Sequence, residues 1–314
     1  LCWNVDAVKE IADALGEGGL VVDVPDMLED LWDGRPQIPV TPITTLDVDT
    51  FGGTPRTEKI SWLRKWMLLK GVDRVLLSSL DEIAWILNVR GSDIEYNPLV
   101  ISYLLVSQDD VKWFVKKGVA DDPDTLDSFS ELEMDGVRIE DYDAVFFALS
   151  DFSELRMDGV EIEDYDAVFF ALSDFSSEQS PVTLFIDPST LNHHINTYIQ
   201  AAYPAERIVC GTSPVILEKA VKTPSEIESM RQTYIDDGVA MECFLHWLET
   251  EVATGREVDE WEASERLTQF RAQIPGYRGN SFENISAYGP GAALPHYSTP
   301  REGSAVIRPF GLYL

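Results

Sequence analysis

The sequence predicts an α/β fold, with a layered sheet covered by helices. Helical and strand-like segments alternate over residues 55–210, a pattern that favours a sheet packed between helices. A long helix then begins at Thr223, where a capping sequence precedes helically spaced apolar residues. Two short extended segments around a glycine-bearing turn follow at residues 281–297. We therefore expect an α/β domain followed by the beginning of another domain.

Composition restricts the classes of function. The chain has 314 residues, enough for two domains and part of a third, and it is 45% hydrophobic. Lys and Arg number 24 against 55 Asp and Glu, which leaves a formal net charge of −31. This charge argues against nucleic-acid binding, which needs a basic face, and against binding to anionic membrane surfaces. A solvated acidic surface is the favoured interpretation, with a high-salt habitat as the alternative.

The cysteines form no recognisable disulfide or metal pattern. Cys2, Cys210 and Cys243 are widely spaced, and we expect buried free thiols in a reducing compartment. No stretch approaches the roughly 20 apolar residues of a membrane span. No signal peptide precedes the first helix, but residue 1 is leucine rather than methionine. We therefore expect the natural N-terminus to lie upstream, which makes that absence uninformative.

The N-terminal part holds too little apolar sequence to close a core alone. A helix is predicted over Val5–Leu15, and residues 1–33 resemble the tail of a domain. Residues 34–56 are rich in Pro, Gly and Thr, which predicts an extended connector.

The next unit opens with helices that carry clear end signals. Pro55 suits the start of a helix, and Gly71 suits its end. Ser79 is predicted to cap a second helix, with Asp81 and Glu82 in its first turn. A third helix is expected to start near Pro188. Strands are predicted at 74–77, 99–107, 111–115, 182–187 and 207–210.

A direct tandem repeat occupies residues 129–174. The copies, 129–151 and 152–174, differ only at Glu133/Arg156 and Arg138/Glu161. Each copy predicts a short strand followed by a short helix. Because solenoids need at least three units, two copies do not form one. A recent local duplication or a gene-model error is favoured over a functional repeat, and one copy is expected to bulge out as an insertion.

The C-terminal part begins with a strong helix signal. Thr223 and Glu226 form a capping box around Pro224. A second helix is predicted from about Val258 to Ile274, and a last strand over 310–314. The apolar face of the long helix is predicted to consist of Ile227, Met230, Tyr234, Met241, Leu245 and Leu248.

The four histidines differ in what they predict. His193 and His194 are neighbours on a helix and do not share a face, so a surface position is favoured. His246 is expected to pack or to be solvated. His296 ends the second extended segment of SFENISAYGPGAALPHY (281–297), and for it both a structural and a catalytic role are open. Phe282 and Tyr297, which flank this segment pair, are expected to be core aromatics.

Three segments together resemble the Xaa-Pro aminopeptidase (aminopeptidase P) family, and most closely its three-domain eukaryotic cytosolic form, which is related to prolidase and creatinase. They are SLDEIAWILNVRGSDIEYNPLVISYLLV (79–106), AVKTPSEIESMRQTYIDDGVAMECFLHWLE (220–249) and SFENISAYGPGAALPHYSTP (281–300). The resemblance implies that residues 1–45 end a first domain and that 55–218 form a creatinase-N-like α/β domain. Residues 219–314 would then be the incomplete start of an α+β pita-bread catalytic domain.

The resemblance also implies an activity. The family removes the N-terminal residue from peptides with proline in second position, using two Mn²⁺ ions that hold a bridging hydroxide. His296 matches the family histidine that contacts the substrate near the scissile bond, which implies both a catalytic and a substrate-binding role. A homodimer, a peptide substrate with an Xaa-Pro N-terminus and a cytoplasmic location are implied as well.

The sequence departs from the family at the metal site. The family's ligands, two aspartates, a histidine and two glutamates, would lie beyond Leu314. Glu283, Glu302 and the His193–His194 pair have neither the spacing nor the convergence to replace them. We therefore expect this chain alone to bind no Mn²⁺ tightly and to be inactive as a peptidase. A non-catalytic homologue serving as a dimerisation or peptide-binding module is the alternative, and a creatinase- or prolidase-like substrate is a third possibility.

Overall fold

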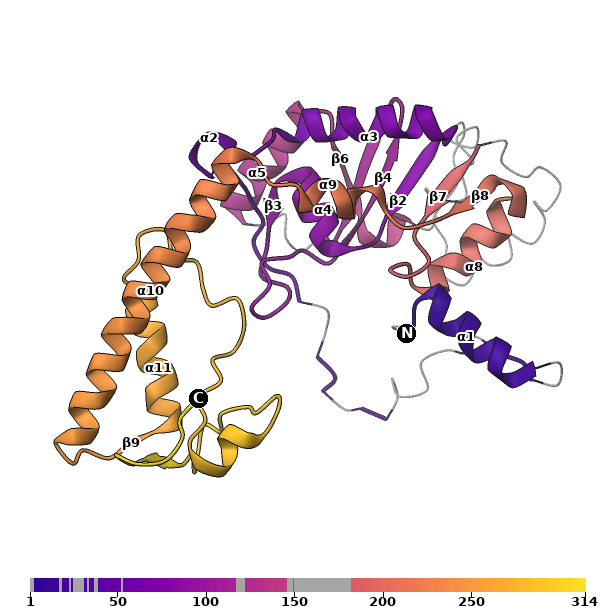
Figure 1. Cartoon of the computed structure of the whole chain (residues 1–314). Helices are drawn as coiled ribbons and strands as arrows, with labels where there is room; N and C mark the ends of the chain where they lie inside the picture. The colour runs from indigo at the N-terminus through magenta and orange to yellow at the C-terminus, as the bar shows by residue number, and fades with distance from the viewer. Residues whose placement is uncertain are drawn as a thin grey trace. The chain divides into compact units, whose positions relative to one another are not determined.

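The computed structural model describes residues 3–16, 19–22, 24, 31–32, 34–36, 39–51, 53–116, 122–145, 149 and 182–314. The chain divides into two compact units (Figure 1). The first, here called the sheet unit, comprises residues 1–48, 54–94 and 98–221. The second, the helical unit, comprises 49–53, 95–97 and 222–314. No helix of the described ranges is long and apolar enough to cross a membrane.

A six-stranded mixed sheet organises the sheet unit, in the order β6-β5-β4-β2-β7-β8. Central strand β2 is antiparallel to β4 and parallel to β7, so Val75 lies opposite both Val106 and Phe185. The strands are β2 (Arg74–Leu77), β4 (Ser102–Ser107), β5 (Val111–Val115), β6 (Arg138–Asp141), β7 (Leu184–Ile186) and β8 (Ile208–Cys210). The five strands predicted from sequence are confirmed, three of them with shorter bounds.

Helices cover both faces of this sheet, as the α/β prediction requires. Successive residues of a strand point to opposite faces, so Val75 and Leu77 join one core cluster and Leu76 the other. The first cluster packs under α3, α4, α5 and α9, and the second under α8 with Val5 of α1 (Figure 1). The helices are α1 (Val5–Leu15), α3 (Arg56–Lys70), α4 (Leu80–Leu87), α5 (Pro123–Met134), α8 (His193–Ala202) and α9 (Pro214–Ala220).

The predicted ends of α3 and α4 are confirmed, with one change of detail, whereas the helix expected to start near Pro188 is α8, which begins at His193. Gly71 ends α3 in the left-handed conformation, at φ 66°, and its N–H donates to the Leu68 and Met67 carbonyls. Ser79 is the N-cap residue of α4, but no helix amide donates to its side chain. Its hydroxyl instead donates to the Asp81 carboxylate at 2.6 Å, because that acceptor lies only two residues away.

Residues 34–56 are not simply an extended connector, so that prediction is wrong in part. Short strand β1 (Thr44–Thr45) pairs antiparallel with β3 (Val89–Arg90), and a one-turn helix α2 (Val48–Phe51) follows. Ile43 is fully buried, and its N–H donates to the Thr125 hydroxyl at 2.9 Å. The segment therefore contributes to the core, since one apolar side chain and one backbone amide find partners there.

The first copy of the tandem repeat is part of the sheet unit. It supplies β6 and the short 3₁₀ helix η3 (Tyr142–Ala144), and its Leu132, Val137 and Leu149 are buried. The second copy, residues 152–174, lies outside the described residues. The expectation that it forms an insertion therefore stays a prediction.

The helical unit packs two helices of unequal length around a small core. The capping box at the start of α10 (Pro224–Ala253) is confirmed by reciprocal hydrogen bonds between Thr223 and Glu226. The core contains Phe244 and Leu248 of α10, Leu267 of α11 and Ile307 of β10. The other elements are η5 (Ala205–Arg207) in the sheet unit and β9 (Val258–Asp259), α11 (Glu260–Arg271), η6 (Gly289–Ala293) and β10 (Val306–Ile307) here.

The predicted apolar face of α10 is wrong over its first half and at Leu245. Tyr234 is 75% exposed, and Ile227, Met230 and Leu245 are also exposed, whereas Leu248 is buried. Helix rise explains the difference, because α10 is about 45 Å long and α11 only about 18 Å. Helix α11 therefore covers only part of α10.

The described cysteines are exposed rather than buried, which corrects the expectation from sequence. Cys210 ends the edge strand β8, and Cys243 lies on the solvent side of α10. Both positions lack a covering layer, since an edge strand and an amphipathic helix each leave one side in water. Cys2 lies outside the described residues. His194 and His246 are exposed, as predicted, and His193 is half-buried.

Candidate functional site

The segment that carries His296 is a loop rather than a strand pair. Residues 281–305, here called the His296 loop, connect α11 to β10. The predicted tight turn is a 3₁₀ helix, η6, with Pro290 near its start. Pro290 has no N–H to donate to a strand partner, and its fixed φ suits a first helical turn. The strand-turn-strand prediction for 281–297 is therefore wrong.

The backbone before η6 pairs with the last residues of the chain. Ala287 and Leu314 exchange hydrogen bonds of 2.9 Å, and the Gly289 N–H donates to Leu312 at 2.9 Å. Tyr288 and Tyr313 form an isolated antiparallel bridge. The predicted last strand, 310–314, therefore exists only as this short pairing. Its partner, the backbone around Tyr288, was expected to pair instead with the second extended segment, which ends at His296.

His296 lies exposed in a turn, with its backbone in the left-handed region at φ 57°. Asn88 and Tyr96 are the other non-glycine residues with positive φ in the described ranges. Such a conformation costs about 1 kcal/mol or more and persists only where neighbouring contacts determine it. Hydrogen bonds of Tyr288, Tyr297, Thr299 and Ala305 hold the chain on either side of His296.

A buried glutamate at the start of α11 holds the loop at three points. Glu260 is 1% exposed. One carboxylate oxygen, Oε1, accepts from the Tyr288 N–H at 2.6 Å. The other, Oε2, accepts from the Tyr297 hydroxyl at 2.8 Å and from the Ala305 N–H at 3.1 Å. One carboxylate therefore joins the residue before η6, the residue after His296 and the residue before β10.

Tyr297 is fixed by its ring as well as by its hydroxyl. A Cβ atom added at Gly291 would lie 3.2 Å from Tyr297 Cζ, so the ring packs closely on the backbone of η6. Burial raises the pKa of the Tyr297 hydroxyl, and the hydrogen bond to Glu260 and the charge of that carboxylate raise it further. The hydroxyl therefore stays protonated as a donor.

A threonine closes the base of the His296 loop. The buried Thr299 hydroxyl accepts from the Ser286 N–H at 3.0 Å and donates to the Ser286 carbonyl at 3.0 Å. The Ser286 hydroxyl lies 2.9 Å from the Tyr313 hydroxyl. The two ends of the loop are thereby joined around η6 and His296.

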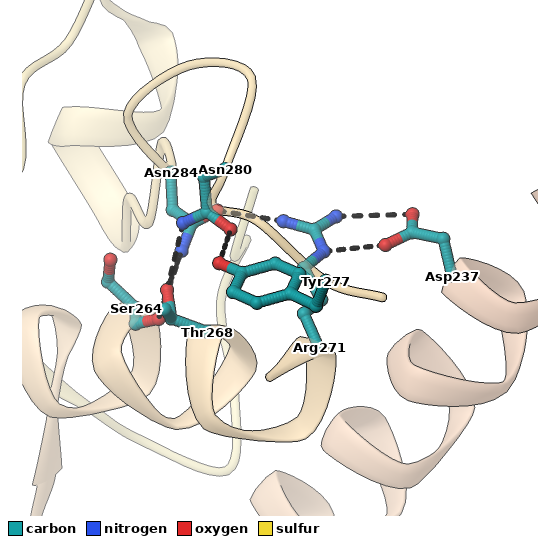
Figure 2. Close-up of polar contacts among 7 residues, drawn as sticks. All are labelled: Asp237, Ser264, Thr268, Arg271, Tyr277, Asn280 and Asn284. Carbon is teal, nitrogen blue, oxygen red and sulfur yellow. Dashed lines mark hydrogen bonds and ion pairs between the residues drawn. The ribbon is translucent and has the colours of Figure 1, made fainter. Parts of the chain in front are cut away.

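A polar network attaches the first part of the loop to both helices (Figure 2). Arg271 of α11 faces Asp237 of α10, with Nε 2.6 Å from Oδ1 and Nη2 3.3 Å from Oδ2. The third nitrogen, Nη1, donates to Asn284 Oδ1 at 2.9 Å. A bidentate guanidinium–carboxylate pair fixes orientation as well as distance. Arg271 therefore ties the first part of the loop, at Asn284, to α10 and α11.

Asn284 and Asn280 complete this network on the surface of α11 (Figure 2). The Asn284 amide donates to the Ser264 carbonyl at 3.0 Å and to the Thr268 hydroxyl at 2.9 Å. Asn280 donates to the same hydroxyl at 3.0 Å and accepts from Tyr277 at 2.8 Å. Burial raises the pKa of Tyr277, against the opposing effect of the nearby Arg271 charge.

The residues that hold His296 were not identifiable from the sequence. Glu260 follows the N-cap Asp259, where an acidic residue is explained by the helix dipole alone. Phe282, expected in the core, is 67% exposed, so that prediction is wrong. Tyr297, also expected in the core, is only half-buried and belongs to none of the core clusters of the described residues, and its hydroxyl contact with Glu260 had no sequence signal.

In the part of the chain that the structure describes, no set of metal ligands surrounds His296. The residues that the structure describes contain no group of three or more His, Cys, Asp or Glu side chains that could hold a metal ion. Glu283, a carboxylate of the same loop, accepts from the Ser298 hydroxyl at 3.0 Å. What the site offers is one exposed imidazole, able to donate or accept a hydrogen bond, on a firmly held loop.

Comparison with known proteins gives two consecutive family matches. Residues 34–226 match the model of the creatinase/prolidase N-terminal domain, and residues 228–314 match that of metallopeptidase family M24.

Individual relatives are similar along nearly the whole chain. A probable Xaa-Pro aminopeptidase P of Laccaria bicolor is 30% identical over 92% of this chain and 40% of its own length. One from Chaetomium globosum is 32% identical over 95% of this chain and 44% of its own. A crystal structure of X-prolyl aminopeptidase from Caenorhabditis elegans, a cytosolic enzyme with a di-nuclear active site, is 29% identical with a TM-score of 0.80. The match covers 97% of this chain and 45% of the C. elegans chain. The chain thus spans less than half the length of these relatives.

Proposed function

This chain belongs to the creatinase/prolidase N-terminal domain family, and from that premise we propose that it is part of an Xaa-Pro aminopeptidase. The substrate would be a peptide with proline in second position, and the reaction removes its first residue. The similarity to Xaa-Pro aminopeptidases along more than nine-tenths of the chain supports this assignment. So does the M24 metallopeptidase match that includes the His296 loop.

Within this enzyme, His296 is proposed to contact the peptide near the bond that is cleaved. The observation that carries this role is the geometry of its loop. An exposed imidazole stands on a backbone held in the left-handed conformation by buried contacts on both sides. A side chain presented in this way can hydrogen-bond to the carbonyl before proline without first ordering the loop.

A metal pair belongs to the proposed enzyme but not to the described residues of this chain. Metal ions are suggested by the M24 match and by the di-nuclear site of the C. elegans enzyme, and we propose manganese. The described residues do not supply a fitting donor set. The contribution that we propose for the described residues is the contact of His296 with the peptide.

The proposed setting follows the C. elegans enzyme, which is cytosolic. We propose a cytoplasmic location for the same reason, and a homodimer by family resemblance. Size-exclusion chromatography with light scattering tests the homodimer, and a monomer at micromolar concentration contradicts it.

Peptide binding by His296 tests the proposed function directly. The chain has four histidines, so selective ¹³C,¹⁵N-histidine labelling gives a simple NMR spectrum. Titration with Arg-Pro-Pro is expected to move the His296 resonances and to leave those of exposed His246 unchanged. His296→Ala should weaken binding at least about fivefold, the equivalent of a ~1 kcal/mol hydrogen bond.

Two controls make the result specific. His246→Ala should bind Arg-Pro-Pro like the wild-type chain, and Arg-Ala-Ala should bind more weakly than Arg-Pro-Pro. Unmoved His296 resonances at saturating Arg-Pro-Pro, or equal affinity of the His296→Ala variant, contradict the assignment.

The alternative is a non-catalytic homologue that serves as a dimerisation or peptide-binding module. We expect the pure chain to release no arginine from Arg-Pro-Pro when Mn²⁺ is added. Release that stops on addition of a chelator would show that the chain does form a working metal site, and the alternative would then be rejected.

A further inference from the structure

We propose that Glu260 is a positioning residue for His296, an inference that rests on the proposed peptide contact of that histidine. The carboxylate lies in the interior of the helical unit, whereas His296 is exposed. Glu260 acts through Tyr288, which precedes η6, and through Tyr297, which directly follows His296, and by its three hydrogen bonds it determines where the imidazole stands.

The first step is the chemistry that requires a carboxylate at this position. Three donors converge on Glu260, namely two backbone N–H groups and one hydroxyl. An ionised carboxylate only accepts, and its two oxygens offer enough lone pairs for all three. A glutamine offers one accepting oxygen, and its NH₂ group would face one of these donors. The site therefore discriminates between glutamate and its closest isostere.

The second step is the position of the donors along the chain. Tyr288 precedes η6, and Tyr297 directly follows His296. Holding both residues on one carboxylate closes a short loop, residues 289–296, of which the exposed His296 is the last residue. The conformational freedom of a short closed loop is small, so the left-handed backbone at His296 can persist.

The third step is the independent packing of Tyr297 on η6. The close approach of its ring to Gly291 is possible because this residue has no Cβ, and the would-be Cβ lies 3.5 Å from Glu260 Oε1. The ring, the glycine and the carboxylate therefore form one contact. Removing the Tyr297 hydroxyl deletes its hydrogen bond to Glu260 but leaves the volume of the side chain nearly unchanged.

The test compares three variants by the NMR signals of His296. Tyr297→Phe and Glu260→Gln are expected to shift the His296 ring and Cα resonances, with the Cα shift moving away from its left-handed value. The resonances of His193, His194 and His246 should not move. Tyr203→Phe serves as the control, because it deletes a hydroxyl that is hydrogen-bonded to Arg74 in the sheet unit. It should leave His296 unchanged.

The outcomes separate this inference from the proposed function. If Tyr297→Phe leaves the His296 resonances where they are in a folded chain, the positioning role is overturned, whether or not Arg-Pro-Pro binds. If Arg-Pro-Pro never perturbs His296 in the wild-type chain, the proposed function fails, and the positioning role is still judged by the peptide-free spectra. If Glu260→Gln does not fold, Tyr297→Phe alone decides. Where both assignments hold, Tyr297→Phe should also weaken Arg-Pro-Pro binding by a factor of about three or more.

Discussion

Buried carboxylates in both units join elements by accepting hydrogen bonds. Glu260 holds the His296 loop, and Glu82 of α4 accepts from the Ser213 hydroxyl at 2.5 Å. Ser213 is the N-cap of α9, and its own N–H donates to Asp187 at 2.8 Å. In each case a helix residue becomes the attachment point of a distant segment. The stability of the fold therefore depends on individual hydrogen bonds to these buried carboxylates.

Stability should depend on pH through Glu82. Burial raises the pKa of this carboxyl, the charges of Asp81 and Asp187 raise it further, and the Ser213 hydrogen bond and Lys219 oppose them. Because the folded pKa lies above the unfolded value, the contribution of Glu82 is complete below the unfolded pKa. It is lost as pH rises through the folded pKa. The free energy of unfolding of wild type should therefore fall relative to that of Glu82→Gln as pH increases.

Urea unfolding from about pH 4 to about pH 8 measures this difference. A pH-independent difference for Glu82→Gln would contradict the assignment.

Two glycines should respond with opposite sign to alanine. At Gly291 a Cβ would lie 3.2 Å from Tyr297 Cζ and 3.3 Å from Cε2, so Gly291→Ala should destabilise the chain by about 1 kcal/mol. Gly238 lies inside α10 with open space at its Cβ, so Gly238→Ala should stabilise by about 0.5–1 kcal/mol. Thermal unfolding followed by circular dichroism compares them. Equal changes in stability for the two variants would show that Tyr297 does not pack on η6 as described.

Among the helices and strands, α10 shows that the local sequence can specify where a helix starts without specifying which of its faces is buried. The capping box satisfies backbone donors at residues 223–226, whereas the first half of the helix exposes several apolar side chains. Local hydrogen bonds set where the helix begins, but burial depends on which element lies beside it. The prediction of the helix was confirmed, and that of its buried face was not.

Removal of the cap should weaken the start of α10. Thr223→Ala deletes the hydroxyl that accepts from the Glu226 N–H, and a loss of about 1 kcal/mol in the free energy of unfolding is expected. Thr233→Ala is the matched control, because that hydroxyl donates to the Ser229 carbonyl within the helix. Alanine there should be neutral or slightly stabilising. Urea unfolding of both variants measures this, and a Thr233→Ala loss as large as that of Thr223→Ala would contradict it.

For the whole molecule, the dominant property is a formal net charge of −31. Repulsion among unpaired carboxylates destabilises the folded state, and salt screens it. The thermal midpoint should therefore rise as ionic strength increases from about 10 mM to about 1 M, where the screening length falls from about 30 Å to about 3 Å. NaCl and KCl should act equally. A midpoint that falls with salt would mean that the ion pairs outweigh the repulsion.

Local patterns of residues were sufficient to specify the strands of the sheet, the helix ends and the family. Strand Arg74–Leu77, the glycine at the end of α3 and the capping box of α10 each follow from residues within a few positions of one another. Local sterics and hydrogen bonds act over that range, so these features can be predicted before any fold is known. The resemblance of three segments singled out His296 for the same reason, because a motif is local.

The way in which the His296 loop is held depends instead on contacts between distant segments. The donors to Glu260 lie 28, 37 and 45 positions away from it in the chain, and Ala287 pairs with Leu314 rather than with its own neighbours. Such contacts depend on which segments the folded core brings together, and on which groups would otherwise be buried without a partner. No periodicity or spacing encodes that choice, so a carboxylate explained locally by a helix dipole proves to be the residue that holds the site.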